Sequence, residues 1–176
     1  MNHKFEKLSE LGAGDFEHLD GNLIDHLMGT MALLKAWSAS TVLQNAGLYH
    51  ASYGTAGFDE RLVSTEQRGK IANIIGEDAE EIVYNYCACD RDYYWPQIGI
   101  KDIPEFKNRF TGETYPLSVN QLQLFCELTV ANELEIAVDN PNFVKKYGVE
   151  LYSVFSNMSP YLTVQAYANV HEVLGG

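Results

Sequence analysis

Apolar positions recur at helical spacing over most of the chain, and they predict a protein built almost wholly of α-helices. The clearest run comprises Leu23, Leu27, Met31 and Leu34, at intervals of three and four residues, so these side chains share one helix face. Similar runs predict further helices over residues 4–11, 42–51, 64–75, 78–90, 118–138, 142–156 and 160–173. No segment alternates convincingly between apolar and polar positions with a period of two, which disfavours a sheet.

Capping residues indicate where several of these helices begin. Asn22 precedes the run from Leu23, Ser40 or Thr41 precedes the next run, and Ser118 precedes the long helix near the end of the chain. Such side chains accept hydrogen bonds from the first free N–H groups of a helix. Residues 64–67 read Ser-Thr-Glu-Gln, which is the pattern of a capping box.

Between residues 91 and 116 the helical pattern stops. Aromatic residues such as Tyr93-Tyr94-Trp95 mix there with charges, prolines and glycine, which predicts an irregular insertion or lid with a short hairpin around residues 110–115. No internal repeat or linker divides the rest of the chain. We therefore expect a single all-α domain, a helical bundle over residues 10–174, preceded by an N-terminal helix or extension over residues 1–9.

The composition of the chain limits the kinds of molecule that it is expected to bind. The chain has 176 residues, 24 of them acidic and 12 basic, and its formal charge of −12 opposes binding to nucleic acid or to an anionic membrane surface. No run of about 18 apolar residues could span a bilayer, and the first residues lack the apolar stretch of a signal peptide. We expect a cytoplasmic protein with reduced cysteines, of which Cys87 and Cys126 lie in the core.

Three of the predicted helices each carry a metal-capable side chain on an apolar face or at its end, namely His26, His50 and Asp90. Buried histidine and aspartate cost free energy unless they are paired. Taken singly, such a histidine is more often a hydrogen-bonded core residue than a ligand, and an aspartate at a helix end more often caps or stays solvated. The three together, with His18 just upstream in a glycine-containing loop, predict a shared polar centre.

Four stretches carry a resemblance to known proteins: Gly12-Ala13-Gly14-Asp15-Phe16-Glu17-His18, Asp25-His26-Leu27, Ala46-Gly47-Leu48-Tyr49-His50-Ala51-Ser52-Tyr53-Gly54-Thr55 and Cys89-Asp90-Arg91. A histidine on one helix, a second near the end of the next and a late aspartate resemble the HD-domain superfamily of metal-dependent phosphohydrolases and oxygenases. More closely, the stretches resemble an uncharacterised HD-like family. The similarity spans roughly residues 10–95.

The resemblance implies an all-α, HD-like core with a divalent metal held by His26, His50 and Asp90. In the superfamily an aspartate follows the second histidine, and here that position is Ala51. The departure puts the two-metal phosphohydrolase mechanism in doubt and predicts one tightly held ion. Two imidazoles and one carboxylate suit Fe(II), with Mn or Zn as alternatives. His18 is a candidate fourth ligand or general acid/base.

Tyr53 and Arg91 are candidate catalytic residues beside the proposed ligands. Tyr53 lies in a glycine-containing turn, from which a side chain can reach the mouth of a cavity. Arg91 could bind a substrate carboxylate or phosphate, although a surface salt bridge is the safer interpretation. Ligating histidines usually donate their second ring N–H to a carboxylate or carbonyl, and Asp15, Asp25 and Glu133 are the carboxylates considered.

Three functions follow from these residues. The first is a metal-dependent enzyme acting on a small organic molecule, with oxidative, non-haem iron chemistry favoured because the dyad aspartate is missing. The second is an HD-type phosphohydrolase, for which the chain offers few cations near the ligands beyond Arg91, Arg68 and Lys70. The third is a degenerate, non-catalytic module that binds a ligand.

Overall fold

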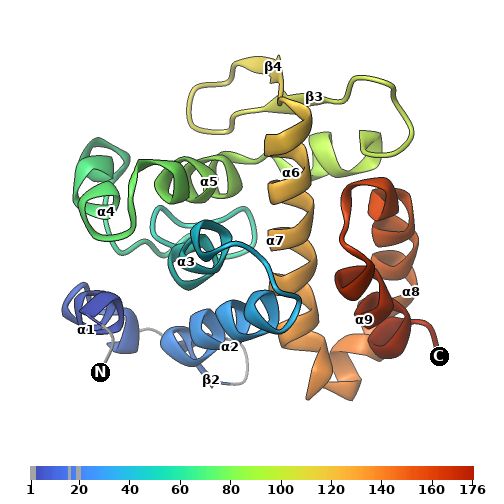
Figure 1. Cartoon of the computed structure of the whole chain (residues 1–176), viewed down its shortest axis with the longest axis horizontal. Coiled ribbons are helices and arrows are strands. Elements are labelled where there is room, and N and C mark those ends of the chain that lie inside the picture. Colours follow the sequence, from blue (N-terminus) through green and yellow to red (C-terminus); the bar gives the residue numbers. More distant parts are fainter. Residues whose placement is uncertain (1–2, 16, 19–20) are drawn as a thin grey trace. The chain divides into compact units, whose positions relative to one another are not determined.

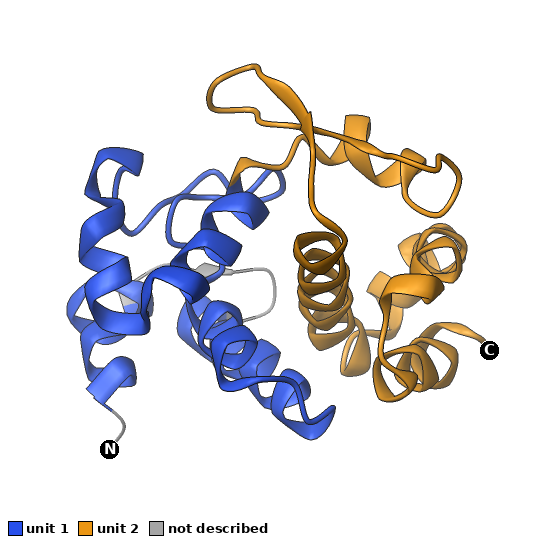
Figure 2. Cartoon of the chain, turned by 45° about the horizontal axis from the view of Figure 1, so that its top comes forward, with its two compact units in different colours: residues 1–87 blue, residues 88–176 orange. Residues whose placement is uncertain are grey.

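The structure is a computed structural model, and it describes residues 3–15, 17–18 and 21–176, with the side chains of residues 15–21 outside that description. The described chain is predominantly helical, with only short strands (Figure 1), which confirms the predicted α class. Its contacts divide it into two compact units, residues 1–87 and residues 88–176 (Figure 2). The single HD-like domain over residues 10–174 stays a prediction.

The first unit begins with α1 (His3–Glu10), the 3₁₀ turn η1 (Ala13–Asp15) and a two-stranded hairpin of β1 (Glu17–His18) and β2 (Gly21–Asn22). It continues with α2 (Leu23–Ala36), α3 (Thr41–Tyr49), η2 (Thr65–Gln67), α4 (Arg68–Ile75) and α5 (Glu77–Ala88), whose last residue lies at the boundary between the units. The helices therefore fall close to the predicted ranges.

The predicted helix caps are present in this unit. The Asn22 side chain accepts a hydrogen bond from the Asp25 N–H at 2.9 Å, and the Ser40 hydroxyl accepts one from the Leu43 N–H at 3.2 Å. These bonds satisfy N–H groups that have no partner within the helix. α2 and α3 thus begin at residues that the local sequence already marks.

The second unit contains α6 (Arg91–Tyr94), η3 (Trp95–Gln97), β3 (Glu105–Lys107), β4 (Thr114–Pro116), α7 (Val119–Val138), α8 (Pro141–Met158), η4 (Ser159–Tyr161) and α9 (Val164–Leu174). The predicted irregular insertion is a short helix followed by the β3–β4 hairpin. Its strands pair Phe106 with Tyr115, and Phe106 is buried against the rings of Tyr94 and Phe125. Aromatic packing therefore fixes the hairpin in this unit.

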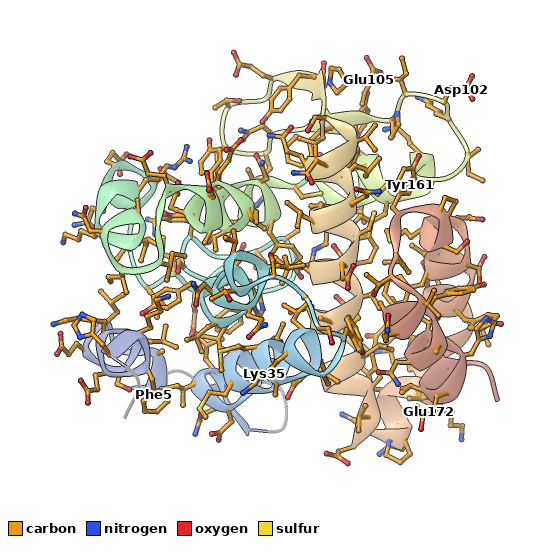
Figure 3. The ribbon with its side chains drawn as sticks, viewed as in Figure 1. Phe5, Lys35, Asp102, Glu105, Tyr161 and Glu172 are labelled. Atoms are coloured by element: carbon orange, nitrogen blue, oxygen red, sulfur yellow. The ribbon has the colours of Figure 1, made fainter. Side chains whose placement is uncertain are left out.

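Polar and apolar side chains separate as the pattern predicts. Lys35, Asp102 and Glu172 are exposed (Figure 3), whereas the free cysteines Cys87 and Cys126 are fully buried, as expected. No helix in the described ranges is long and apolar enough to cross a membrane.

Candidate functional site

Two histidines meet in the interior of the first unit. α2 carries His26 in its second turn, and His50 is the residue that caps the C-terminal end of α3. Their Nε2 atoms are 3.2 Å apart, with the rings edge to face at an interplanar angle of 80°. The exposed fractions are 6% for His26 and 1% for His50. The structure thus brings together two of the three predicted metal ligands.

The outer nitrogen of His50 is held by backbone. Its Nδ1 lies 2.7 Å from the carbonyl oxygen of Gly47. A carbonyl oxygen only accepts hydrogen bonds, so Nδ1 carries the hydrogen and donates it. In the neutral ring, Nε2 is then the acceptor nitrogen, and it lies 3.2 Å from Nε2 of His26. The acceptor for the outer N–H of His50 is therefore a backbone carbonyl. It is not one of the carboxylates considered for this role, Asp15, Asp25 and Glu133.

Other residues of the first unit contact the backbone of both histidines and the ring of His50. The Cys87 thiol donates to the His50 carbonyl oxygen at 3.0 Å, and the Thr30 hydroxyl donates to the His26 carbonyl oxygen at 3.0 Å. The Tyr86 ring packs edge to face on His50, with centroids 5.4 Å apart. Side chains from α2 and α5 therefore fix the backbone at both histidines.

Tyr53 lies in a buried ion-pair network. Its hydroxyl donates to Glu80 Oε1 at 2.7 Å, and Arg68 donates to both carboxylate oxygens of Glu80 at 2.7 Å. Burial, followed by the bond to Glu80, raises the pKa of Tyr53, so the phenol stays protonated. With 2% of its surface exposed, Tyr53 anchors the turn after His50 to α5, and a catalytic role for it stays a prediction.

Glu80 belongs to this network, and sequence reasoning did not select it. It lies in the first turn of α5, where the macrodipole favours acidic residues whether or not they are buried. Yet Glu80, Val83 and Cys87 follow one another at helical spacing, and the latter two are fully buried. A carboxylate on a buried helix face requires a partner, and this spacing was the available signal.

Asp90 lies in the second unit, in a setting different from the expected one. α5 ends at Ala88, because Cys89 forms a β-bridge with Asn108 and the Asp90 N–H donates to the Lys107 carbonyl. The expectation that Asp90 ends the apolar stripe of this helix is therefore wrong.

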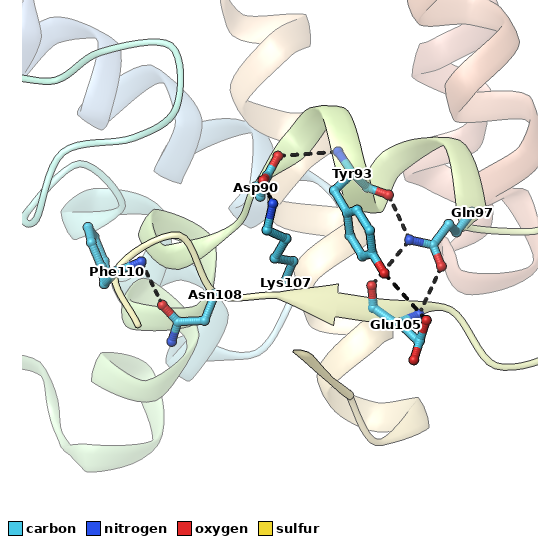
Figure 4. Close-up of polar contacts among 7 residues, drawn as sticks. All are labelled: Asp90, Tyr93, Gln97, Glu105, Lys107, Asn108 and Phe110. Atoms are coloured by element: carbon cyan, nitrogen blue, oxygen red, sulfur yellow. Dashed lines mark hydrogen bonds and ion pairs between the residues drawn. The ribbon is translucent and has the colours of Figure 1, made fainter. Parts of the chain in front are cut away.

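The Asp90 carboxylate caps α6 and pairs with a lysine (Figure 4). It accepts a hydrogen bond from the Tyr93 N–H at 3.3 Å and lies 2.8 Å from Lys107 Nζ. The bond from Lys107 lowers the pKa of Asp90. The side chain is 28% exposed, and its role as a metal ligand stays a prediction.

Arg91 makes a half-buried ion pair within the second unit. Its Nη1 lies 3.3 Å from Glu133 Oε1, an oxygen that also accepts a hydrogen bond from the Asn132 side chain at 3.0 Å. The Arg91 guanidinium lies 5.2 Å from the centre of the Trp95 ring. The expected salt bridge is present but more buried than a surface pair, and substrate binding by Arg91 stays a prediction.

His18 falls outside the described side chains. Its backbone pairs with Gly21 in the hairpin that leads into α2, and its role as a fourth ligand or general acid stays a prediction. Among the residues whose side chains are described, no three of the types His, Cys, Asp and Glu are grouped closely enough to hold a metal ion.

Comparison with known families gives one match. Residues 7–91 match the family described as "Domain of unknown function (DUF6817)". No curated protein and no solved structure matched the chain. The matched stretch includes both His26 and His50, and the description of the family states no activity.

Proposed function

We propose that the protein is a metal-dependent enzyme that acts on a small organic molecule, with His26 and His50 as two ligands of a single divalent ion. Iron, with oxidative chemistry, is favoured over manganese or zinc. The observation that carries the proposal is the approach of two buried Nε2 atoms to 3.2 Å. The roles of Asp90 and His18 as further ligands remain predictions from the sequence, and the proposal concerns the histidine pair alone.

The donor pair fits such an ion. Two nitrogens that each lie roughly 2.0–2.1 Å from one metal are about 2.9–3.4 Å apart at octahedral or tetrahedral angles, which includes the observed 3.2 Å. The Nδ1–H of His50 is donated to the Gly47 carbonyl oxygen, and ligating histidines normally make an outer bond of this kind. The pair therefore has the spacing and, at His50, the tautomer that a ligand requires.

The chain's own residues would bind and shield the reacting centre. A divalent ion with open positions supplies Lewis acidity, and iron adds oxidative chemistry. His26 and His50 supply nitrogen donors in a buried setting, where water is excluded and electrostatic interactions are stronger. The hydrogen bond from the Cys87 thiol to the His50 carbonyl oxygen helps to fix the backbone that carries the imidazole ring.

Two observations favour oxidation over phosphate ester hydrolysis. Ala51, at the position of the superfamily's dyad aspartate, supplies no carboxylate to bridge a second ion. Arg68, one of the few cations considered for phosphate binding, has its guanidinium held by both oxygens of Glu80. In a non-catalytic module, His26 and His50 would instead form a simple N–H···N hydrogen bond with no metal between them. Metal analysis distinguishes this alternative from a metal-dependent enzyme.

The test begins with the metal content of protein purified without an affinity tag and loaded anaerobically with Fe(II). Wild-type protein should hold close to one ion per chain, and His26→Ala and His50→Ala should lose it. His171→Ala is the matched control, because His171 is an exposed histidine bonded to Tyr152. Absence of metal from the loaded wild type, or full retention by His50→Ala, would refute the proposal.

Two assays on the iron-loaded protein then distinguish oxidation from phosphate ester hydrolysis. Oxygen consumption with a panel of small organic acids and polyols is expected under the oxidative proposal. Phosphate release from nucleotides would overturn it in favour of the phosphohydrolase alternative.

A further inference from the structure

The two helices that carry the histidine pair approach closely at Gly47. A Cβ added to Gly47 of α3 would lie 2.6 Å from Cδ1 of Leu34 and 3.5 Å from Cα of Met31, both on α2. Leu34 is fully buried, so its side chain has little room to move aside in a close-packed interior. The missing side chain therefore permits the spacing between α2 and α3.

Gly47 also contacts the site directly. Its carbonyl oxygen accepts the Nδ1–H of His50, one turn further along, at 2.7 Å. One residue thus affects both the distance between the helices and the orientation of one ring. The Nε2–Nε2 distance between His26 and His50 depends on both quantities.

We infer that Gly47 is a positioning residue for the histidine pair. Its lack of a side chain sets how closely α2 brings His26 to His50, and its carbonyl turns the His50 ring so that Nε2 faces His26. The consequence for metal binding rests on the proposed function. The geometry of the two rings does not, because it can be measured in the metal-free protein.

The experiment compares Gly47→Ala with a variant designed to relieve its clash. Leu34→Val removes the Cδ1 atom that the new Cβ would meet, so Leu34→Val/Gly47→Ala should restore the wild-type spacing. Gly69→Ala is the matched control, because an added Cβ at this α4 glycine has no neighbour within 4 Å. Zn²⁺ affinity is measured by competition with a chromophoric chelator, and the imidazole ¹⁵N resonances are measured without metal.

Gly47→Ala keeps the carbonyl oxygen but displaces α3 and thereby disturbs the outer contact of His50. We therefore expect Zn²⁺ binding to weaken about 10- to 100-fold, the usual range for perturbing such a contact. The substitution should also shift the ring resonances of His26 and His50. The double variant should recover most of the affinity, and Gly69→Ala should match wild type. A folded Gly47→Ala protein with wild-type affinity and unchanged ring resonances would overturn the inference.

Two further results keep the test decisive. If Gly47→Ala does not fold, the double variant Leu34→Val/Gly47→Ala decides the matter: rescue of folding with near-wild-type Zn²⁺ affinity would support the inference, because Leu34→Val removes only the clash. A double variant that still does not fold, or that binds Zn²⁺ tenfold more weakly than Leu34→Val alone, would overturn it. If wild-type protein binds no Zn²⁺, the proposed function loses its support. The ring resonances of the metal-free variants then decide the role of Gly47 alone.

Discussion

The Arg68–Glu80 ion pair should contribute far more stability than an exposed pair of the same length. The Nη2–Oε2 distance is 2.7 Å, and the side chains are 38% and 6% exposed. The exposed Lys7–Glu10 pair has a distance of 2.6 Å, with side chains 38% and 59% exposed. The distances are nearly equal, and the cations are equally exposed. The pairs differ in the burial of the carboxylate, in the cation, and in the additional hydrogen bonds that Glu80 accepts from Arg68 and Tyr53.

The expected magnitudes follow from these exposures. Exposed pairs contribute about 0.2–1 kcal/mol, and i,i+3 or i,i+4 helix pairs about 0.3–0.5 kcal/mol. Breaking a fully buried pair costs about 3–5 kcal/mol, but Arg68 keeps partial access to water, which reduces this cost. We expect a coupling energy of about 2 kcal/mol for Arg68 with Glu80, and about 0.5 kcal/mol or less for Lys7 with Glu10.

Double-mutant cycles in urea measure both quantities. Arg68→Met and Glu80→Gln form one cycle, and Lys7→Met and Glu10→Gln form the control. Trp37 is a buried reporter in the first unit, and a Trp95→Phe background removes the other tryptophan, so fluorescence follows the unit that contains both pairs.

The result that would refute this reasoning is equal coupling in the two cycles. It would mean that the carboxylate of Glu80 is solvated as well as that of Glu10, and that the network around Tyr53 does not hold the turn after His50. An unchanged urea m-value across the variants is the control for two-state behaviour.

Two further perturbations test the second unit. Burial raises the pKa of Glu127, whose carboxylate accepts a hydrogen bond from Thr163, so its charged form costs stability as the pH rises through the folded-state pKa. Glu127→Gln should therefore be more stable than wild type at pH 7 and lose this advantage below pH 4.5, the ordinary pKa; equal urea midpoints at pH 7 would contradict this. Gly99→Ala should cost about 3 kcal/mol or more, because its Cβ would lie 1.9 Å from the Asn157 carbonyl oxygen; an unchanged melting temperature would contradict this.

The helices could be predicted because apolar spacing and capping residues, which determine them, lie close together in the sequence. α2 shows this most simply, since its spacing places Leu23, Leu27 and Leu34 on the buried face and Asn22 caps its start. The hairpin after α6 was placed at residues 110–115, whereas its strands are Glu105–Lys107 and Thr114–Pro116. Its position depends on where Phe106 packs, and no short-range pattern contains that information.

The residues of the candidate site also divide into those placed by local sequence and those placed by contacts distant in the sequence. His26 and His50 were predictable because His26 lies on the apolar side of α2 and His50 directly follows α3 in register with its apolar side, so that periodicity directs both inward. Asp90 was misplaced because a β-bridge to a residue distant in the sequence ends α5 before it. Glu80 was missed because its partners, Arg68 and Tyr53, are distant along the chain and are brought to it by packing.

The turn after His50 helps to hold the histidine pair. The Ser52 carbonyl accepts hydrogen bonds from the N–H groups of Leu62 and Val63, and the Tyr53 hydroxyl is bound by Glu80. His50 therefore lies between the Gly47 carbonyl on one side and a turn fixed at two points on the other. If the pair binds an ion as proposed, packing and backbone hydrogen bonds around it would limit the conformational entropy lost on binding. The position of His50 is thus set by the Gly47 carbonyl and by the hydrogen bond from Cys87 of α5.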